Sequence, residues 1–358
     1  TDYDVYRSSD DVRLATVGSA TSQYQLSSLD ANTQYTVYVR ATNAQGAGIG
    51  SSPASAYTDA DAPTSLTHSA NTTASITWGW SSGGAQNSYY ASTATPADNS
   101  GWVSANGWVQ SGLSANAAIE VSVKAKNEEG TETSPSTYTA YTSQNIPIGI
   151  TKSDLSTTSL TIIADGTLGN LTEGSSGLYF TNTTASTNSG WIQTNSWANS
   201  SLSANTQYSY TVKARNGDSD ETSTTVDSSS TIFYTAQNTP SGISSSNILI
   251  DSITLSATGT FDNLTSDSSG LYFENVTAGT NSGWVQTNSW VETGLSESTT
   301  YQYRVKTRNG DGVETSFSSG TNVITLGARS GGGGGRAPIP IPIPDPDPEI
   351  DPPVLSEP

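Results

Sequence analysis

The residues that could form a catalytic or metal site are few, and the numbers of histidines and cysteines limit which sites are possible. The chain of 358 residues has one histidine, His68, and no cysteine. Nucleophilic triads need a base beside the nucleophile, and zinc sites need several Cys or His ligands. Neither arrangement can be assembled around His68 alone. Paired carboxylates occur, but no cleft-forming insertion interrupts the chain to hold them. We therefore predict that the chain is not an enzyme and uses no cofactor.

Acidic loops are the one place where a metal ion could bind. Asp262 with Asp267, and the run Asp218-Ser219-Asp220-Glu221, offer the hard oxygen ligands that calcium prefers. Neither has the spacing of a known calcium loop, and acidic residues also keep a surface soluble. Calcium is therefore the alternative to no cofactor. The formal net charge of −19 argues against nucleic acid as a partner.

Tryptophans recur in pairs six residues apart. The pairs are Trp102/Trp108, Trp191/Trp197 and Trp284/Trp290. Exposed rings of this kind can stack on sugars, whereas buried ones fill a core. Because a core position must be filled in every copy, we expect the second member of each pair to be buried. The first members are candidates for surface binding of glycans: Trp102, Trp191 and Trp284.

The tryptophan pairs belong to a longer repeat. The stretch from Asn281 to Asp311 is nearly the same string as the stretch from Asn188 to Asp218, and looser copies end at Asn127 and Asn43. Repeats take precedence over chain length in dividing a sequence. We predict four units, at residues 1–60, 61–145, 146–238 and 239–327, followed by a Gly/Pro-rich tail at 328–358.

Each repeat contains a predicted strand and turn. Tyr301, Tyr303 and Val305 alternate with polar residues, which is typical of a strand with one buried face. The following Asn309-Gly310 predicts a tight hairpin in which both central residues have positive φ. A unit of this size, built from such strands, predicts a small all-β sandwich.

The repeated order of leucine, tyrosine, alternating strand and Asn-x-x-Gly resembles strands E to G of the fibronectin type III family. The resemblance implies tandem immunoglobulin-like β-sandwiches and a tyrosine corner at the tyrosine six residues after the leucine. That residue is Tyr35, Tyr208 or Tyr301 in three units. In the second unit it is Ile119, whose missing hydroxyl should cost about 1 kcal/mol of stability.

The first unit begins inside the domain pattern. The stretch Tyr3–Arg7 resembles strand C of that family, and no strands A and B precede it. Either the sequence cuts the domain or another segment supplies those strands. In the second unit, Ser75–Trp80 resembles strand B, with Trp78 or Trp80 buried. The short junctions between units predict a semi-rigid rod.

The tail alternates isoleucine with proline. In an extended strand the amides of Ile339, Ile341 and Ile343 point to one edge, and the prolines donate nothing at the other edge. Such a segment could add to an open sheet in a neighbouring copy and join subunits head to tail. The alternative is an extended spacer.

The composition indicates an extracellular or cell-surface protein. No run is long and apolar enough to span a membrane, and a Ser/Thr/Asn-rich acidic array without cysteine resembles prokaryotic secreted and surface proteins. We expect a non-enzymatic structural or adhesive protein that spaces or builds a cell-surface assembly. Its expected partners are other copies of itself, other surface proteins or glycans. The alternatives are accessory modules of a secreted polysaccharide-degrading enzyme and a subunit of a head-to-tail filament.

Overall fold

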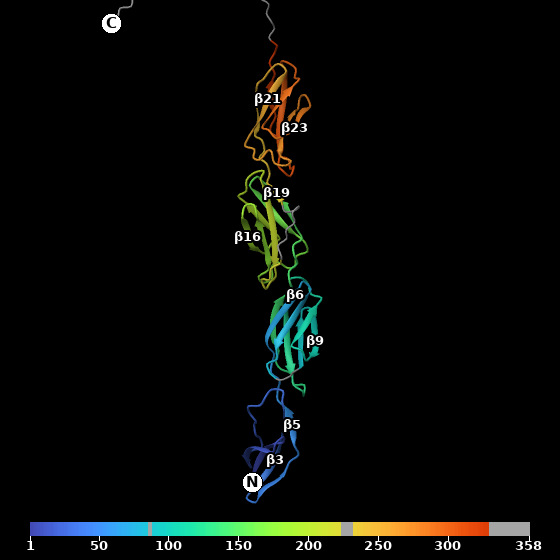
Figure 1. Ribbon diagram of the computed structural model, residues 1–358, viewed down its shortest axis with the longest axis vertical. Helices are drawn as coiled ribbons and strands as arrows, with labels where there is room; N and C mark the ends of the chain where they lie inside the picture. Colours follow the sequence, from blue (N-terminus) through green and yellow to red (C-terminus); the bar gives the residue numbers. More distant parts are fainter. Residues whose placement is uncertain (85–87, 223–231, 329–358) are drawn as a thin grey trace, which may run out of the picture.

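The protein is a row of β-sandwiches. The structure, a computed structural model, describes residues 1–84, 88–222 and 232–328, which form 26 strands in seven antiparallel sheets and no helix. Figure 1 shows four units following one another along the long axis. Consequently, these ranges contain no helix able to cross a membrane. The all-β fold predicted from the alternation of residues is confirmed.

Units 2, 3 and 4 share one topology, for which we use the letters A, B, C, C′, E, F and G. Strands A, B and E form a three-stranded sheet, and C′, C, F and G form a four-stranded sheet. In unit 2 these strands, in chain order, are β6 (Thr64–Thr72), β7 (Ser75–Ser81), β8 (Ser88–Ala94), β9 (Ala97–Val103), β10 (Gly107–Ser111), β11 (Ala118–Lys126) and β12 (Ser136–Tyr141).

The same order repeats in the next two units. In unit 3 the strands are β13 (Gly149–Ser153), β14 (Ser159–Asp165), β15 (Gly177–Asn182), β16 (Thr187–Ile192), β17 (Ser196–Ser200), β18 (Gln207–Arg215) and β19 (Ile232–Tyr234). In unit 4 they are β20 (Gly242–Ser246), β21 (Ser252–Thr258), β22 (Gly270–Asn275), β23 (Thr280–Val285), β24 (Ser289–Thr293), β25 (Thr300–Arg308) and β26 (Thr321–Ile324).

Each complete unit has its own core between the two sheets. Along β25 the side chains of Tyr301, Tyr303 and Val305 are buried, as their alternation predicts. The tyrosine corner also forms: the Tyr301 hydroxyl accepts the backbone N–H of Ser296 at 2.8 Å. Equivalent bonds reach Tyr208 from Ser203 at 2.9 Å and Tyr35 from Asp30 at 3.0 Å. Unit 2 buries Ile119 there, and both Trp78 and Trp80 lie in its core.

Unit 1 is half a sandwich. It holds only the C′–C–F–G sheet, formed by β1 (Asp2–Arg7), β2 (Val12–Gly18), β3 (Gln34–Asn43), β4 (Gly46–Gly50) and β5 (Ala54–Tyr57). The stretch 21–27 corresponds in sequence to strand E but forms no strand, because the strand B with which E pairs in the other units is missing. The inner face is left partly open, so Tyr3 is 38% exposed whereas its counterpart Tyr89 is 1% exposed.

The predicted tight Asn-Gly hairpin is wrong. Neither Asn309 nor Gly310 has positive φ; Gly312 does, at 81°. The turn is longer, with the N–H of Gly312 bonded to the carbonyl of Asn309 and the N–H of Asn309 bonded to the carbonyl of Val313. The Asn309 side chain accepts the N–H of Val313 at 2.8 Å, which stabilises this wider turn from inside.

The core of unit 4 contains a buried carboxylate. Glu292 is 5% exposed and accepts hydrogen bonds from Tyr303 at 2.6 Å, from Asn275 at 2.9 Å, and from Thr280. Unit 3 has an amide at the same place, where Asn199 accepts the Tyr210 hydroxyl at 2.9 Å. Burial raises the pKa of Tyr303, and the hydrogen bond and charge of Glu292 raise it further.

Unit 4 should therefore lose stability in alkali. An unfolded tyrosine ionises near about pH 10, whereas folded Tyr303 keeps its proton to higher pH, so each rise above about pH 10 favours the unfolded chain. Below that pH its contribution is constant. We expect Tyr303→Phe to weaken this dependence and to remove one late-ionising phenol from the absorbance titration at 295 nm. Tyr272→Phe, on the outer face of β22, is the control; an identical titration in both variants would contradict the assignment.

Candidate functional site

In units 2, 3 and 4 an asparagine of the F–G turn contacts the preceding unit, so this contact recurs at all three junctions. Asn127, Asn216 and Asn309 are each at most 3% exposed. Their side-chain Nδ2 atoms donate to backbone carbonyls of the unit before: to Thr58 at 3.1 Å, Thr142 at 3.3 Å and Thr235 at 3.0 Å. We use the term junction latch for this hydrogen bond together with a second one, in which an asparagine of the preceding unit accepts a backbone N–H of the same turn.

A second asparagine completes the latch from the other side. It lies between strands E and F of the preceding unit, and its Oδ1 accepts a backbone N–H from the next unit's F–G turn. The pairs are Asn32 with Glu128 at 3.0 Å, Asn116 with Gly217 at 2.9 Å, and Asn205 with Gly310 at 2.9 Å. All three asparagines have positive φ, a conformation that asparagine tolerates better than most residues.

The sequence analysis missed these asparagines, although a signal was present. Leu-x-x-Asn occurs with its asparagine at Asn32, Asn116 and Asn205, and strand F begins two residues later each time. In unit 4 the same place holds Ser298, also at positive φ. In the described structure, the amide thus occurs in each of the three units that contact a following sandwich.

Acidic residues take part in the same junctions. The carboxylates of Glu129, Asp218 and Asp311 accept the backbone N–H of a tyrosine at the end of the preceding strand G, at 3.1, 2.7 and 3.0 Å. The loops proposed for calcium are therefore engaged in protein contacts. Within the three described ranges, no group of three or more His, Cys, Asp or Glu side chains is arranged to hold a metal ion.

A tyrosine hydroxyl adds a further contact at the junction of units 3 and 4. Tyr234 donates to the Asp267 carboxylate at 2.7 Å. Burial raises the pKa of Tyr234 to about 12, and the hydrogen bond to Asp267 contributes to that shift. The phenol therefore stays protonated and able to donate at neutral pH.

Units 3 and 4 each contain the stretch Arg-Asn-Gly-Asp, at residues 215–218 and 308–311, and packing explains its glycine. A Cβ on Gly217 would lie 2.3 Å from the ring of Tyr141, and one on Gly310 would lie 2.5 Å from the ring of Tyr234. Real Cβ atoms do not approach other atoms so closely. Only glycine lets the tyrosine of one unit pack against the turn of the next.

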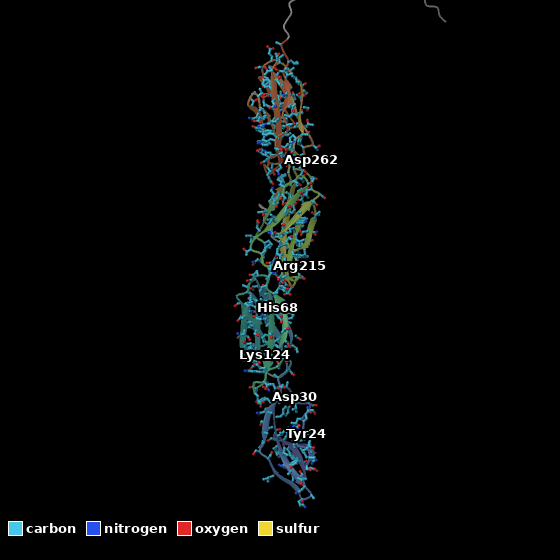
Figure 2. The ribbon with its side chains drawn as sticks, turned by 180° about the vertical axis from the view of Figure 1, so that it is seen from behind. Tyr24, Asp30, His68, Lys124, Arg215 and Asp262 are labelled. Atoms are coloured by element: carbon cyan, nitrogen blue, oxygen red, sulfur yellow. The ribbon has the colours of Figure 1, made fainter. Side chains whose placement is uncertain are left out.

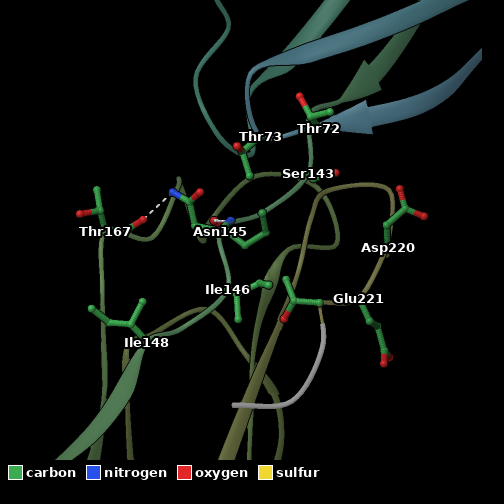
Figure 3. Close-up of a pocket in the computed structure, with 11 residues that line it drawn as sticks. Thr72, Thr73, Ser143, Asn145, Ile146, Ile148, Thr167, Asp220 and Glu221 are labelled. Atoms are coloured by element: carbon green, nitrogen blue, oxygen red, sulfur yellow. Dashed lines mark hydrogen bonds between the residues drawn. The ribbon is translucent and has the colours of Figure 1, made fainter. Parts of the chain in front are cut away.

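A hollow of about 720 Å³ lies beside the junction of units 2 and 3 (Figure 3). The linker residues Ile146 and Ile148 are exposed along it, and Asp220 and Glu221 line it as well. Asn145 bonds the carbonyl of Thr167 at 2.6 Å, which fastens the linker to unit 3. The hollow therefore follows the linker and belongs to the junction.

The first tryptophan of each pair lies on the outer face of the C′–C–F–G sheet. Trp102 is 36% exposed, and Trp191 and Trp284 are partly buried. Each indole lies under a cation of strand F: Lys126 at 4.2 Å from the Trp102 centroid, and Arg215 and Arg308 at 4.4 Å from those of Trp191 and Trp284. One ring face is thus occupied by the protein's own charge. The second tryptophans pack against the cores: Trp108, Trp197 and Trp290.

The remaining predicted residues fall in different places. His68 lies in strand A of unit 2, and Figure 2 shows Asp30, His68 and Asp262 beside the three successive junctions. The strand-addition residues Ile339, Ile341 and Ile343 lie outside the described residues.

If the junction latch restrains neighbouring units, removing it should loosen their relative placement. Replacing Asn309 by alanine leaves the Thr235 carbonyl and loop amides without their partner, which should cost the junction about 1–3 kcal/mol. Spin labels at Ala185→Cys and Ala278→Cys, both exposed, report the distance across units 3 and 4. We expect a broader distance distribution in Asn309→Ala.

Asn43→Ala is the matched control. Asn43 occupies the same position in the F–G turn of unit 1, accepts the N–H of Gln45 at 2.9 Å and is exposed. Its removal should leave the distribution unchanged. Equal widths in Asn309→Ala and the parent chain would show that the latch does not restrain the junction.

Comparison with known proteins gives one family and one curated relative. The model of the fibronectin type III domain matches residues 1–57. Exoglucanase B of Cellulomonas fimi is 28% identical over 248 residues, and the aligned part covers 65% of this chain but 22% of that protein.

Solved structures of low identity also match. One is a segment of two fibronectin type III domains from chicken tenascin, at 17% identity and a TM-score of 0.33, covering 49% of this chain and 100% of the other. Another is the FN1–FN3 region of chicken CNTN1, at 16% identity and a TM-score of 0.26, covering 74% and 98%. The family model matches unit 1, and the C′–C–F–G sheet of unit 1 recurs in units 2 to 4, so the chain is a tandem array of β-sandwiches whose first unit matches the fibronectin type III domain.

Proposed function

We propose that the chain is a non-catalytic, semi-rigid spacer of a prokaryotic extracellular or cell-surface protein. The single observation that carries the proposal is the junction latch, which recurs at every junction in the described part of the chain. Flexible tethering would need no such contacts, and glycine- or serine-rich linkers would suffice. Contacts that fix one unit on the next instead set the direction and length of the array.

The composition of the array supports an exposed, mechanical role. Its surface is acidic, with a formal net charge of −19, which favours solubility and disfavours non-specific association. The sandwiches contain no disulfide, so each depends on core packing and on its neighbours. In this role the array would hold an attached domain away from the cell, and its partners would be other surface proteins or glycans.

Electron microscopy with mass photometry tests this function on the whole chain. We expect single straight rods of monomer mass, because the latches join units within one chain. The Asn127→Ala/Asn216→Ala/Asn309→Ala variant should give bent particles of the same mass. Filaments would contradict the spacer and favour the head-to-tail assembly through Ile339, Ile341 and Ile343. Parent-chain particles that bend at the junction of units 1 and 2 or at the junction of units 3 and 4 would contradict it as well.

The second candidate is an accessory region of a secreted polysaccharide-degrading enzyme. The alignment with exoglucanase B favours it, since the aligned part is a minor fraction of a protein named for acting on a glucan. In this role the outer tryptophans would contact the polysaccharide. Because cations cover one face of each indole, the most exposed one, Trp102, would contribute most.

Retention on an insoluble glucan tests the second candidate. If the array is a glucan-associated module, the chain should be retained on cellulose, and Trp102→Ala should weaken retention more than Trp284→Ala. The Trp197→Phe variant, at a partly buried ring that packs against the core of unit 3, controls for changes in the fold. Lack of retention of the parent chain would remove glucan contact by this array and leave the spacer proposal untouched.

A further inference from the structure

The single histidine and a lysine occupy equivalent places at two successive junctions. His68 of strand A pairs with Trp78 of strand B, which pairs with Trp108 of strand E. One unit later, Lys152 pairs with Ile162, which pairs with Trp197. The registers therefore align His68 with Lys152.

Each side chain faces the equivalent aspartate in the F–G turn of the unit that follows it. Lys152 forms an ion pair with the Asp311 carboxylate, whereas His68 Nε2 lies 3.8 Å from Asp218 Oδ2. All four side chains are between 20% and 29% exposed, so water screens neither contact fully. Asp218 and Asp311 each also accept the N–H of a strand G tyrosine in the same latch.

The two junctions differ in the conditions under which their basic side chain carries a positive charge. A lysine ammonium stays charged through the neutral range, whereas histidine gains and loses its proton between about pH 5 and pH 8 in ordinary settings. When His68 is protonated, the junction of units 2 and 3 has an ion pair at the place where the junction of units 3 and 4 has the pair of Lys152 with Asp311. When His68 is neutral, the junction of units 2 and 3 lacks that pair.

The surroundings of His68 can respond to its proton. Asn71 Nδ2 lies 2.6 Å from His68 Nδ1 and donates to the Tyr141 carbonyl at 2.8 Å, while Asn71 Oδ1 is buried without a hydrogen-bond partner in the described structure. Rotating this amide would offer Oδ1 to a protonated Nδ1 in place of the bond to Tyr141. On the unit 3 side the ionisable group that faces His68 is Asp218. On strand G the Tyr138 ring lies 5.9 Å from the imidazole, and Tyr141 contacts Asp218 through its backbone N–H.

We propose that the junction of units 2 and 3 is a pH-dependent joint, tightened when His68 is protonated and faces Asp218, whereas the junction of units 3 and 4 is held closed by Lys152 at all physiological pH. This inference rests on the junction geometry and not on the proposed function. The sign follows from linkage: a contact that favours the protonated imidazole is strongest at low pH and weakens as pH rises. The array would then bend at one defined place.

Spin labels at two matched pairs of sites test the joint. Ala97→Cys with Ala185→Cys spans units 2 and 3, and Ala185→Cys with Ala278→Cys spans units 3 and 4; all three alanines are exposed. The chain has no cysteine of its own, so labels attach only there. Raising the pH from about 5 to about 8 should increase the bent population across units 2 and 3 roughly two- to fivefold. The distribution across units 3 and 4 should stay constant.

Two substitutions at His68 separate its charge from its shape. His68→Lys should keep units 2 and 3 in a narrow distribution at both pH values, and His68→Gln should give the broad distribution at both. Circular dichroism checks that each variant folds. A pH effect that persists in His68→Gln, that appears equally at both junctions, or that is missing in the parent chain would overturn the proposal.

Discussion

The array depends on one constraint: a buried side-chain amide must have partners for all of its polar atoms. Asn216 meets this requirement by donating across the junction to Thr142 while accepting amides of its own turn. The turn supplies the donors to Oδ1 and one acceptor for Nδ2, the Asp220 carboxylate at 3.2 Å, and the preceding unit supplies the second acceptor, the Thr142 carbonyl. Separating two units would leave that carbonyl and the asparagine to find water instead, and this couples the placement of each sandwich to the next.

The rest of each junction is arranged around that amide. Glycine follows the asparagine at Gly217 and Gly310 because a tyrosine ring of the preceding unit lies where a Cβ would be. The next residue is acidic and accepts a backbone N–H of that tyrosine. The stretch Arg-Asn-Gly-Asp thus serves three functions in order: its arginine covers a tryptophan, its asparagine and glycine form the latch, and its aspartate pairs across the junction.

Strand F carries the cations of the outer face, and the latch asparagine follows directly at its end. Cations alternate with core residues along strand F, and the last of them directly precedes the latch asparagine, as Arg308 precedes Asn309. Most of these cations lie over aromatic rings, and Lys124, Lys213 and Lys306 also pair with glutamates at 2.5 Å. In a chain with 13 basic residues against 32 acidic ones, this placement gathers positive charge on one face of each sandwich. That face and the latch are therefore positioned together.

The buried face of strand F and the tyrosine corner can be read from the amino-acid sequence alone, because they follow from local alternation and from residue types repeated at fixed spacing. It did not reveal the turn at Asn309, whose side chain bonds both Val313 of the same turn and the carbonyls of Tyr234 and Thr235 in another unit. Nor could it place His68 beside Asp218, since 150 residues of chain separate them and the contact forms only when two sandwiches dock. Local pattern decides which face of a strand is buried; only the packing of folded units decides which polar groups meet between them.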